Sequence, residues 1–195
     1  SMHGFPLDTA KAAMRRLLSE LRPQDRFNVI LFAGGSRMLF RSSVMATGGH
    51  IDAALRFVEQ PAGGGGTEML QAIKRAMGTP SAVDSRTFVI VTDGYIHAEA
   101  EAFRYIRQHL GQSNFFAIGI GGSVNHHLIE GIARAGLAES FVISKPQEAS
   151  SVVDRFIAYA STPVLTDIEV KADGVEIFDV TPGRLPDLLA DRPLI

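Results

Sequence analysis

The sequence predicts an α/β fold in which helices cover both faces of a doubly wound, mainly parallel sheet. Two observations predict this class. Short apolar runs alternate with amphipathic segments of about ten residues, which is the pattern of consecutive βαβ units. Two of the runs, 87–91 and 115–120, are almost entirely apolar or β-branched, as expected for strands that are buried on both faces.

The remaining elements follow from periodicity and from turn residues. Helical spacing of apolar residues predicts helices over 7–21, 51–58, 68–77, 98–110, 127–135 and 147–159. Strands are predicted over 27–32, 38–40, 87–91, 115–120 and 140–143. Pro23 ends the first helix. Gly34-Gly35 lies between the first two strands and predicts a hairpin at one edge of the sheet.

The C-terminal residues have a different pattern. In 164–170 and 175–180, apolar and polar residues partly alternate around Ala172-Asp173-Gly174, which predicts a β-hairpin with one exposed face. The last stretch, 181–195, contains several prolines and is expected to be irregular. We therefore divide the chain into an α/β domain over 1–161 and a C-terminal β extension over 162–195.

Composition excludes several classes of protein. The net charge of −2 does not suggest a nucleic-acid or membrane-surface partner. No apolar run approaches the roughly 20 residues of a membrane helix, and the chain carries no targeting signal. The absence of cysteine excludes disulfides, thiolate metal sites and cysteine nucleophiles. The chain opens on Ser1-Met2 with no strand before its first helix, so we expect it to be part of a longer protein.

A candidate cation site lies where the run 87–92 ends, at Asp93-Gly94. Open α/β sheets bind ligands at the carboxyl ends of their strands. A glycine run, 63–66, is followed by Thr67 and a predicted helix, which brings a hydroxyl to the same edge. Carboxylate and hydroxyl oxygens suit a hard cation. The alternatives are that Thr67 only caps a helix that begins at Glu68 and that Asp93 is only a turn residue.

Other candidates are weaker. His126 and His127 are adjacent, so they do not face each other on a helix and are expected to be surface residues. His3 and His97 are expected to be solvated. The stretch 119–122, Gly-Ile-Gly-Gly, follows a strand and precedes a helix, but it lacks the Lys-Ser/Thr ending of a phosphate-binding loop and the dinucleotide fingerprint.

The sequence also lacks the nucleophile elbow Gly-x-Ser-x-Gly, so we do not expect an enzyme. The alternative that stays open is a nucleotide- or phosphate-binding α/β enzyme domain, which would use the loops 63–67 and 119–122.

Three motifs in combination resemble the von Willebrand factor type A domain. They are Phe-Val-Ile-Val-Thr-Asp-Gly at 88–94, Gly-Gly-Gly-Gly-Thr at 63–67 and Phe-Ala-Ile-Gly-Ile-Gly at 116–121. The segments 162–168 and 183–188 resemble the region that follows this domain in bacterial relatives of the inter-α-trypsin-inhibitor heavy chains. The resemblance covers nearly the whole chain.

The resemblance implies a protein-binding, adhesion-type module whose metal-ion-dependent adhesion site holds Mg²⁺ or Mn²⁺. Thr67 and Asp93 match two of its ligands, and Ser1 matches the last serine of its Asp-x-Ser-x-Ser loop. The chain holds neither the Asp-x-Ser portion nor the first strand of the family. The bound cation would accept an acidic side chain from a protein ligand. The family also implies that the parent protein is in the cell envelope or outside the cell.

In the family, the first strand is central in the sheet. Without it, a slot is expected between the strands at 27–32 and 87–91, and exposed backbone groups there would be costly. We expect the slot to be filled in one of three ways. A strand of the tail hairpin at 164–180 could enter it, a strand could be exchanged with another copy to give a homodimer, or 27–32 could pair directly with 87–91.

Overall fold

A computed structural model of the chain describes residues 4–60, 68–81, 86–94, 98–161, 163–165, 174 and 188–189. Its helices are α1 (Phe5–Ser19), α2 (Gly48–Val58), α3 (Met69–Met77), α4 (Glu99–His109), α5 (His126–Ala135) and α6 (Ala149–Ser161), with a 3₁₀ turn at Pro146–Glu148. Its strands are β1 (Arg26–Phe27), β2 (Ile30–Phe32), β3 (Ser36–Met38), β4 (Val44–Met45), β5 (Thr87–Thr92), β6 (Asn114–Ile120), β7 (Ser140–Ile143), β8 (Pro163–Leu165) and β9 (Leu188–Leu189).

The main sheet is parallel and has the order β5-β6-β7. Ile90 of β5 is opposite Ala117 of β6, and Ile118 of β6 is opposite Phe141 of β7. All seven residues of β6 are buried. This central position explains why the run 115–120 is apolar throughout, because a strand covered on both faces has no solvent-facing side chains.

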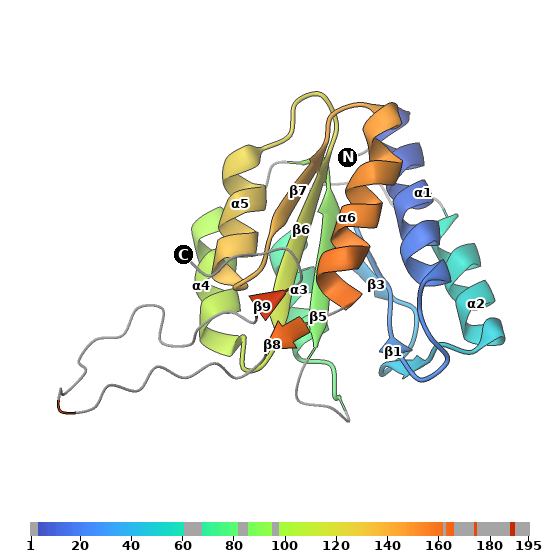
Figure 1. Ribbon diagram of the computed structural model, residues 1–195, viewed down its shortest axis with the longest axis horizontal. Helices are drawn as coiled ribbons and strands as arrows, with labels where there is room; N and C mark the ends of the chain where they lie inside the picture. The colour runs from blue at the N-terminus through green and yellow to red at the C-terminus, as the bar shows by residue number, and fades with distance from the viewer. Residues whose placement is uncertain are drawn as a thin grey trace.

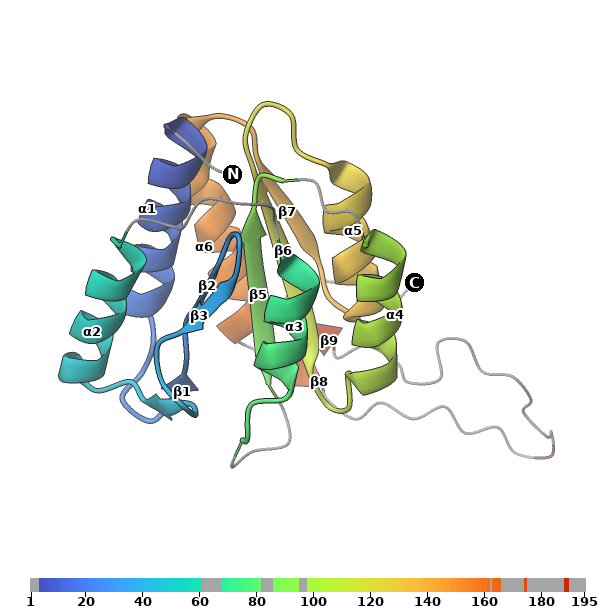
Figure 2. The ribbon, with the colours of Figure 1, turned by 180° about the vertical axis from the view of Figure 1, so that it is seen from behind.

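Helices cover both faces of this sheet, as the sequence predicts (Figures 1 and 2). Phe115 of β6 belongs to one apolar cluster with Ile106 of α4 and Ile132 of α5. Phe116, the next residue of β6, belongs to a second cluster with Phe156 of α6. Neighbouring side chains of a strand point to opposite faces, so β6 contributes to both cores.

A third apolar cluster lies between α1, α2 and the short strands β1 and β4, and Phe27 and Phe57 are members of it. At the surface, Glu59 joins the two helices. It pairs with Arg15, and its second carboxylate oxygen is 3.3 Å from the Lys11 ammonium. The hydrogen bond from Arg15 is the main cause that lowers the pKa of Glu59; desolvation opposes it, and Lys11 adds to the lowering.

The predicted strand 27–32 is interrupted at Asn28. The Asn28 side chain donates to the Phe40 carbonyl at 2.8 Å and accepts from the Phe40 amide at 3.1 Å. It also accepts from the amide of Val29 at 2.8 Å. These bonds replace strand pairing, so β1 pairs with β4 while β2 pairs with β3 in the predicted hairpin, with Ile30 opposite Met38.

Of the three expected ways of filling the slot, the structure excludes the direct pairing of 27–32 with 87–91. β2 is hydrogen-bonded to β3 and β5 to β6, and in the described ranges no backbone ladder joins the two sheets. The structure therefore leaves the slot between β2 and β5 without a described strand. Figure 2 shows the β2–β3 hairpin beside the outer edge of β5.

The tail contains a strand pair that the sequence did not predict. β8, which lies at the start of the predicted hairpin, pairs antiparallel with β9. β9 lies in the stretch 181–195, which was expected to be irregular. Most of 166–187 lies outside the described residues, as does any entry of that segment into the slot.

Candidate functional site at the carboxyl end of the sheet

Asp93 follows β5 directly, at the carboxyl edge of the parallel sheet, and its side chain is half-buried. Its neighbour Thr92 is 3% exposed, and the Thr92 hydroxyl accepts a hydrogen bond from the Gly94 amide at 3.1 Å. This bond fixes the chain where it leaves the strand. Within the described ranges, no hydrogen bond or ion pair engages the Asp93 carboxylate.

Gly121 brings two other segments to the same place. It follows β6 with a φ of 134°, which a residue with a side chain rarely adopts. A Cβ at this position would lie 4.0 Å from the Asp93 Cβ and 3.6 Å from Cγ of Pro6, in the first turn of α1. The start of α1, the end of β5 and the end of β6 therefore meet at one rim, which we call the Asp93 rim.

The other two predicted ligands cannot be placed. Ser1 and Thr67 lie outside the described residues, as do His3 and His97. α3 begins at Met69, one residue later than the helix start assumed for Thr67, so Glu68 has the N-cap position. The Glu68 amide donates to the Ala33 carbonyl at 3.0 Å, which connects the start of α3 to the β2–β3 turn.

The described residues give the Asp93 rim one free carboxylate for a hard cation. Elsewhere in the described ranges, no group of three His, Cys, Asp or Glu side chains could hold a metal ion. A site with a single carboxylate fits an ion that keeps several waters, as Mg²⁺ does, when hydroxyl oxygens complete the set. The residues present are therefore compatible with such an ion and do not make a complete ligand set by themselves.

A polar contact that the sequence analysis missed connects the start of α4 to the loop after β6. The Asn125 side chain caps α5 by accepting from the Leu128 amide at 3.1 Å, and it donates to the Glu99 carboxylate at 2.6 Å. His127 Nε2 is 3.6 Å from the same carboxylate. Asn is a favoured N-cap residue, so its position just ahead of the predicted helix 127–135 is the signal that could have identified Asn125.

The histidines at the start of α5 are exposed, as predicted. His127 has 78% of its side chain accessible and faces Glu99 and the ring of Phe103.

The glycines at 119–121 have structural roles. A Cβ on Gly119 would lie 2.4 Å from Cγ1 of Val124. The absence of a side chain at Gly119 therefore lets the segment between β6 and α5 pack against β6. The Gly121 amide donates to the Ile143 carbonyl at 3.0 Å. That amide is engaged with β7 and is not directed to a phosphate.

No helix in the described ranges is both long and apolar enough to cross a membrane.

The fold and the rim define a class of protein: an α/β domain that presents a carboxylate at the carboxyl edge of a parallel sheet. The profile of the von Willebrand factor type A domain matches residues 1–137, so the chain belongs to this family. The resemblance predicted from the sequence is thereby confirmed.

Curated relatives support the same assignment. A von Willebrand factor A domain-containing protein of Dictyostelium discoideum is 30% identical over 172 residues, which is 87% of this chain and 8% of that protein. Inter-alpha-trypsin inhibitor heavy chain H2 of Mus musculus is 26% identical over 209 residues, covering all of this chain and 22% of the relative. The chain spans less than a quarter of these relatives.

Solved structures have the same fold. A von Willebrand factor type A protein from Catenulispora acidiphila matches with a TM-score of 0.65 and 22% identity, over 78% of this chain and 38% of that one. Proximal thread matrix protein 1 from the mussel byssus, in a structure described as having a zinc-occupied MIDAS motif, matches with a TM-score of 0.61 and 16% identity, over 78% of this chain and 42% of that one.

Proposed function

We propose that this chain is a protein-interaction module that binds its partner through a divalent cation at the Asp93 rim, and that it is not an enzyme. The observation that carries the proposal is the half-buried Asp93 carboxylate, which no described residue neutralises. It lies at the edge where open α/β sheets bind ligands. Family membership supports the same assignment, since these domains are generally interaction modules.

The proposed ligands are Asp93, Thr67 and Ser1, and the proposed ion is Mg²⁺ or Mn²⁺. The zinc-occupied MIDAS motif of the mussel protein supports a divalent ion in general. Bound there, the ion would supply a positive charge with an open coordination position for a carboxylate of the partner. Asp93 provides the only negative charge among these three residues and therefore contributes most to retaining the ion.

Two further parts of the proposal concern the whole protein. We propose that the partner is a protein recognised through an acidic side chain. We also propose that the parent protein lies in the cell envelope or outside the cell. Neither nucleic acid nor membrane insertion has a part in this account.

Calorimetric titration of Mg²⁺ and Mn²⁺ tests the proposal. Asp93→Asn preserves the shape of the side chain and removes its charge, so we expect affinity for the ion to fall by roughly tenfold or more. The matched control is Asp52→Asn, an exposed aspartate on α2, which should bind like the unchanged protein. Equal affinity in the Asp93 and Asp52 variants would contradict the proposal.

The alternative, a nucleotide- or phosphate-binding enzyme domain, predicts a different result. If the alternative holds, ATP or NAD should raise the melting temperature of the protein, whereas Mg²⁺ or Mn²⁺ alone should not. The packing of Gly119 and the engaged amide of Gly121 favour the interaction module.

A further inference from the structure

The starts of two neighbouring helices bring a histidine and a glutamate together. α4 begins at Glu99 and α5 at His126, and the two helices lie side by side (Figures 1 and 2). His127 Nε2 is 3.6 Å from Oε2 of Glu99. This pair belongs to the two helices, whereas the Asp93 rim is formed by the ends of β5 and β6 and the start of α1.

The separation of the pair suits a bridging ion better than a direct hydrogen bond. A hydrogen bond between nitrogen and oxygen places the two atoms about 2.7–3.2 Å apart. Zn²⁺ binds imidazole nitrogen and carboxylate oxygen at roughly 2.0–2.2 Å in tetrahedral sites, so two adjacent ligand atoms lie about 3.4 Å from each other. The observed 3.6 Å is close to this separation.

Both side chains are held in place by neighbouring residues. Asn125 Nδ2 donates to Glu99 Oε1 at 2.6 Å, while Asn125 Oδ1 accepts from the Leu128 amide at 3.1 Å. The His127 ring makes an edge-to-face contact with Phe103, with 5.8 Å between the ring centroids. Such outer partners orient the ligands of metal sites, and here they leave Glu99 Oε2 beside His127.

One chain supplies only half of a zinc site. In the part of the chain that the structure describes, no group of three His, Cys, Asp or Glu side chains could hold a metal ion. Zinc sites normally have four ligands. The His127 side chain is 78% accessible, so the pair is open to another molecule. A second copy related by a two-fold axis would bring an identical pair, and together they supply two nitrogens and two oxygens.

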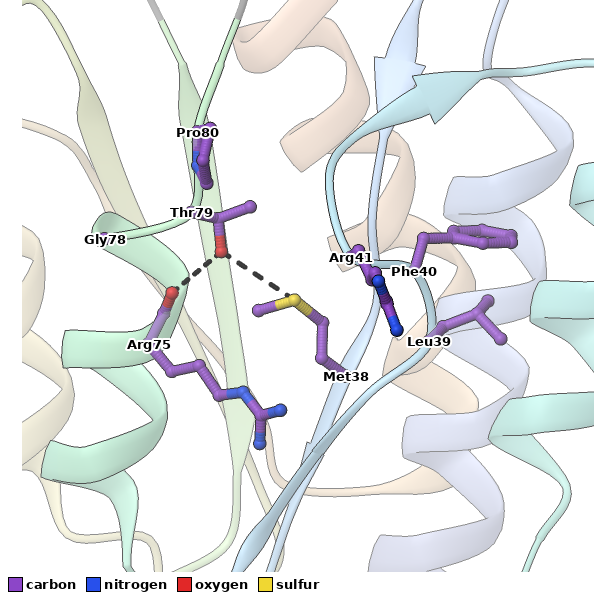
Figure 3. Close-up of a pocket in the computed structure, with 8 residues that line it drawn as sticks. All are labelled: Met38, Leu39, Phe40, Arg41, Arg75, Gly78, Thr79 and Pro80. Carbon is purple, nitrogen blue, oxygen red and sulfur yellow. Dashed lines mark hydrogen bonds between the residues drawn. The ribbon is translucent and has the colours of Figure 1, made fainter.

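The pocket between the end of β3 and the end of α3 does not compete for such an ion. Its lining includes Arg41 and Arg75 but no histidine and no carboxylate (Figure 3). Two guanidinium groups repel a cation.

We propose that His127 and Glu99 form half of a Zn²⁺ site, and that the same pair of a second copy completes it, so that the ion joins two chains. The two carboxylates would balance the charge of the ion. Imidazole nitrogen suits Zn²⁺, whereas Mg²⁺ takes oxygen ligands. This site uses none of the residues proposed as ligands at the Asp93 rim and does not depend on the function proposed there.

Sedimentation velocity with and without Zn²⁺ tests this inference. We expect Zn²⁺ to convert the protein from one chain to two, and a chelator to reverse the change. Mg²⁺ at the same concentration should have no effect on the mass.

Variants of the pair assign the ion to its ligands. His127→Ala, and Glu99→Gln, which keeps an acceptor for Asn125, should each raise the Zn²⁺ concentration needed for half dimerisation by roughly tenfold or more. His126→Ala, at the exposed neighbour on α5, is the matched control and should dimerise normally. Asp93→Asn should also dimerise normally, which separates this site from the cation site at the Asp93 rim.

Three outcomes would overturn the inference. The first is a mass that does not change with Zn²⁺, whether it is that of one chain or of two. The second is an equal response of the His126 and His127 variants. The third is loss of the Zn²⁺-dependent dimer in Asp93→Asn, which would assign the ion to the Asp93 rim.

Discussion

Gly136, which follows α5, lies against the backbone of Phe115 in β6. A Cβ at this position would be 2.1 Å from the Phe115 Cβ and 2.8 Å from its Cα, and neither atom can rotate away. Gly136→Ala should therefore destabilise the domain by about 1–3 kcal/mol in urea unfolding. Gly49→Ala, in the open first turn of α2, is the control and should not lower stability, because nothing lies near its added methyl.

At the same scale, sequence motifs identified the candidate residue Asp93 but could not predict which residues surround it. Asp93 was predicted from the abrupt end of an apolar run, and the structure places it at the carboxyl edge of the sheet. The closeness of Gly121 to both Asp93 and Pro6 arises from the packing of three segments that are distant in the sequence, which no local pattern contains. The ligand roles predicted for Ser1 and Thr67 stay predictions.

At the scale of elements, Asn28 determines how the first hairpin is built. Its side chain makes three hydrogen bonds to the backbone, two of them with Phe40. Asn28→Ala would leave these half-buried groups without partners, and we expect a loss of about 1–3 kcal/mol in thermal or urea unfolding. Ser42→Ala, in the exposed loop nearby, should be neutral. An equally small effect of both changes would contradict the role assigned to Asn28.

Helices and strands could be predicted where the apolar pattern extends over many residues. They could not be predicted where side-chain hydrogen bonds take the place of the backbone bonds between strands. The apolar run at 27–32 predicts one strand, but Asn28 divides it into β1 and β2. β4 has two residues and no periodicity, so its pairing with β1 was missed. The pairing of β8 with β9 was not predicted, because turn residues indicate local pairing and β9 lies far along the chain.

At the scale of the whole molecule, Glu59 joins α1 to α2 through Arg15 and Lys11. The pKa of Glu59 is lowered in the folded state, first of all by its hydrogen bond with Arg15. The ion pairs of Glu59 therefore stabilise the fold at pH values above the usual pKa of a glutamate. This stabilisation is lost as pH falls through the lowered value. Glu59→Gln should therefore reduce the melting temperature slightly at neutral pH and match the unchanged protein in acid.

Glu130→Gln, an exposed change on α5, is the control and should leave the melting temperature at neutral pH unchanged. A constant difference between Glu59→Gln and the unchanged protein at all pH values would contradict the assignment.

The layered architecture could be predicted from alternating apolar and amphipathic segments, because each helix must bury one face against the sheet. The open edge between β2 and β5 was predicted as a slot from the family's strand order. Which segment fills this slot could not be predicted, because three ways of filling it are equally consistent with the sequence. Direct pairing is excluded by the separate sheets.

The central claim is that the Asp93 carboxylate holds a divalent cation. Crystals grown with Mn²⁺ test it most directly, because anomalous scattering locates the ion without assuming its ligands. The account predicts an anomalous peak in direct contact with the Asp93 carboxylate, which is lost in crystals of Asp93→Asn. A peak elsewhere on the molecule, with none at Asp93, would contradict it.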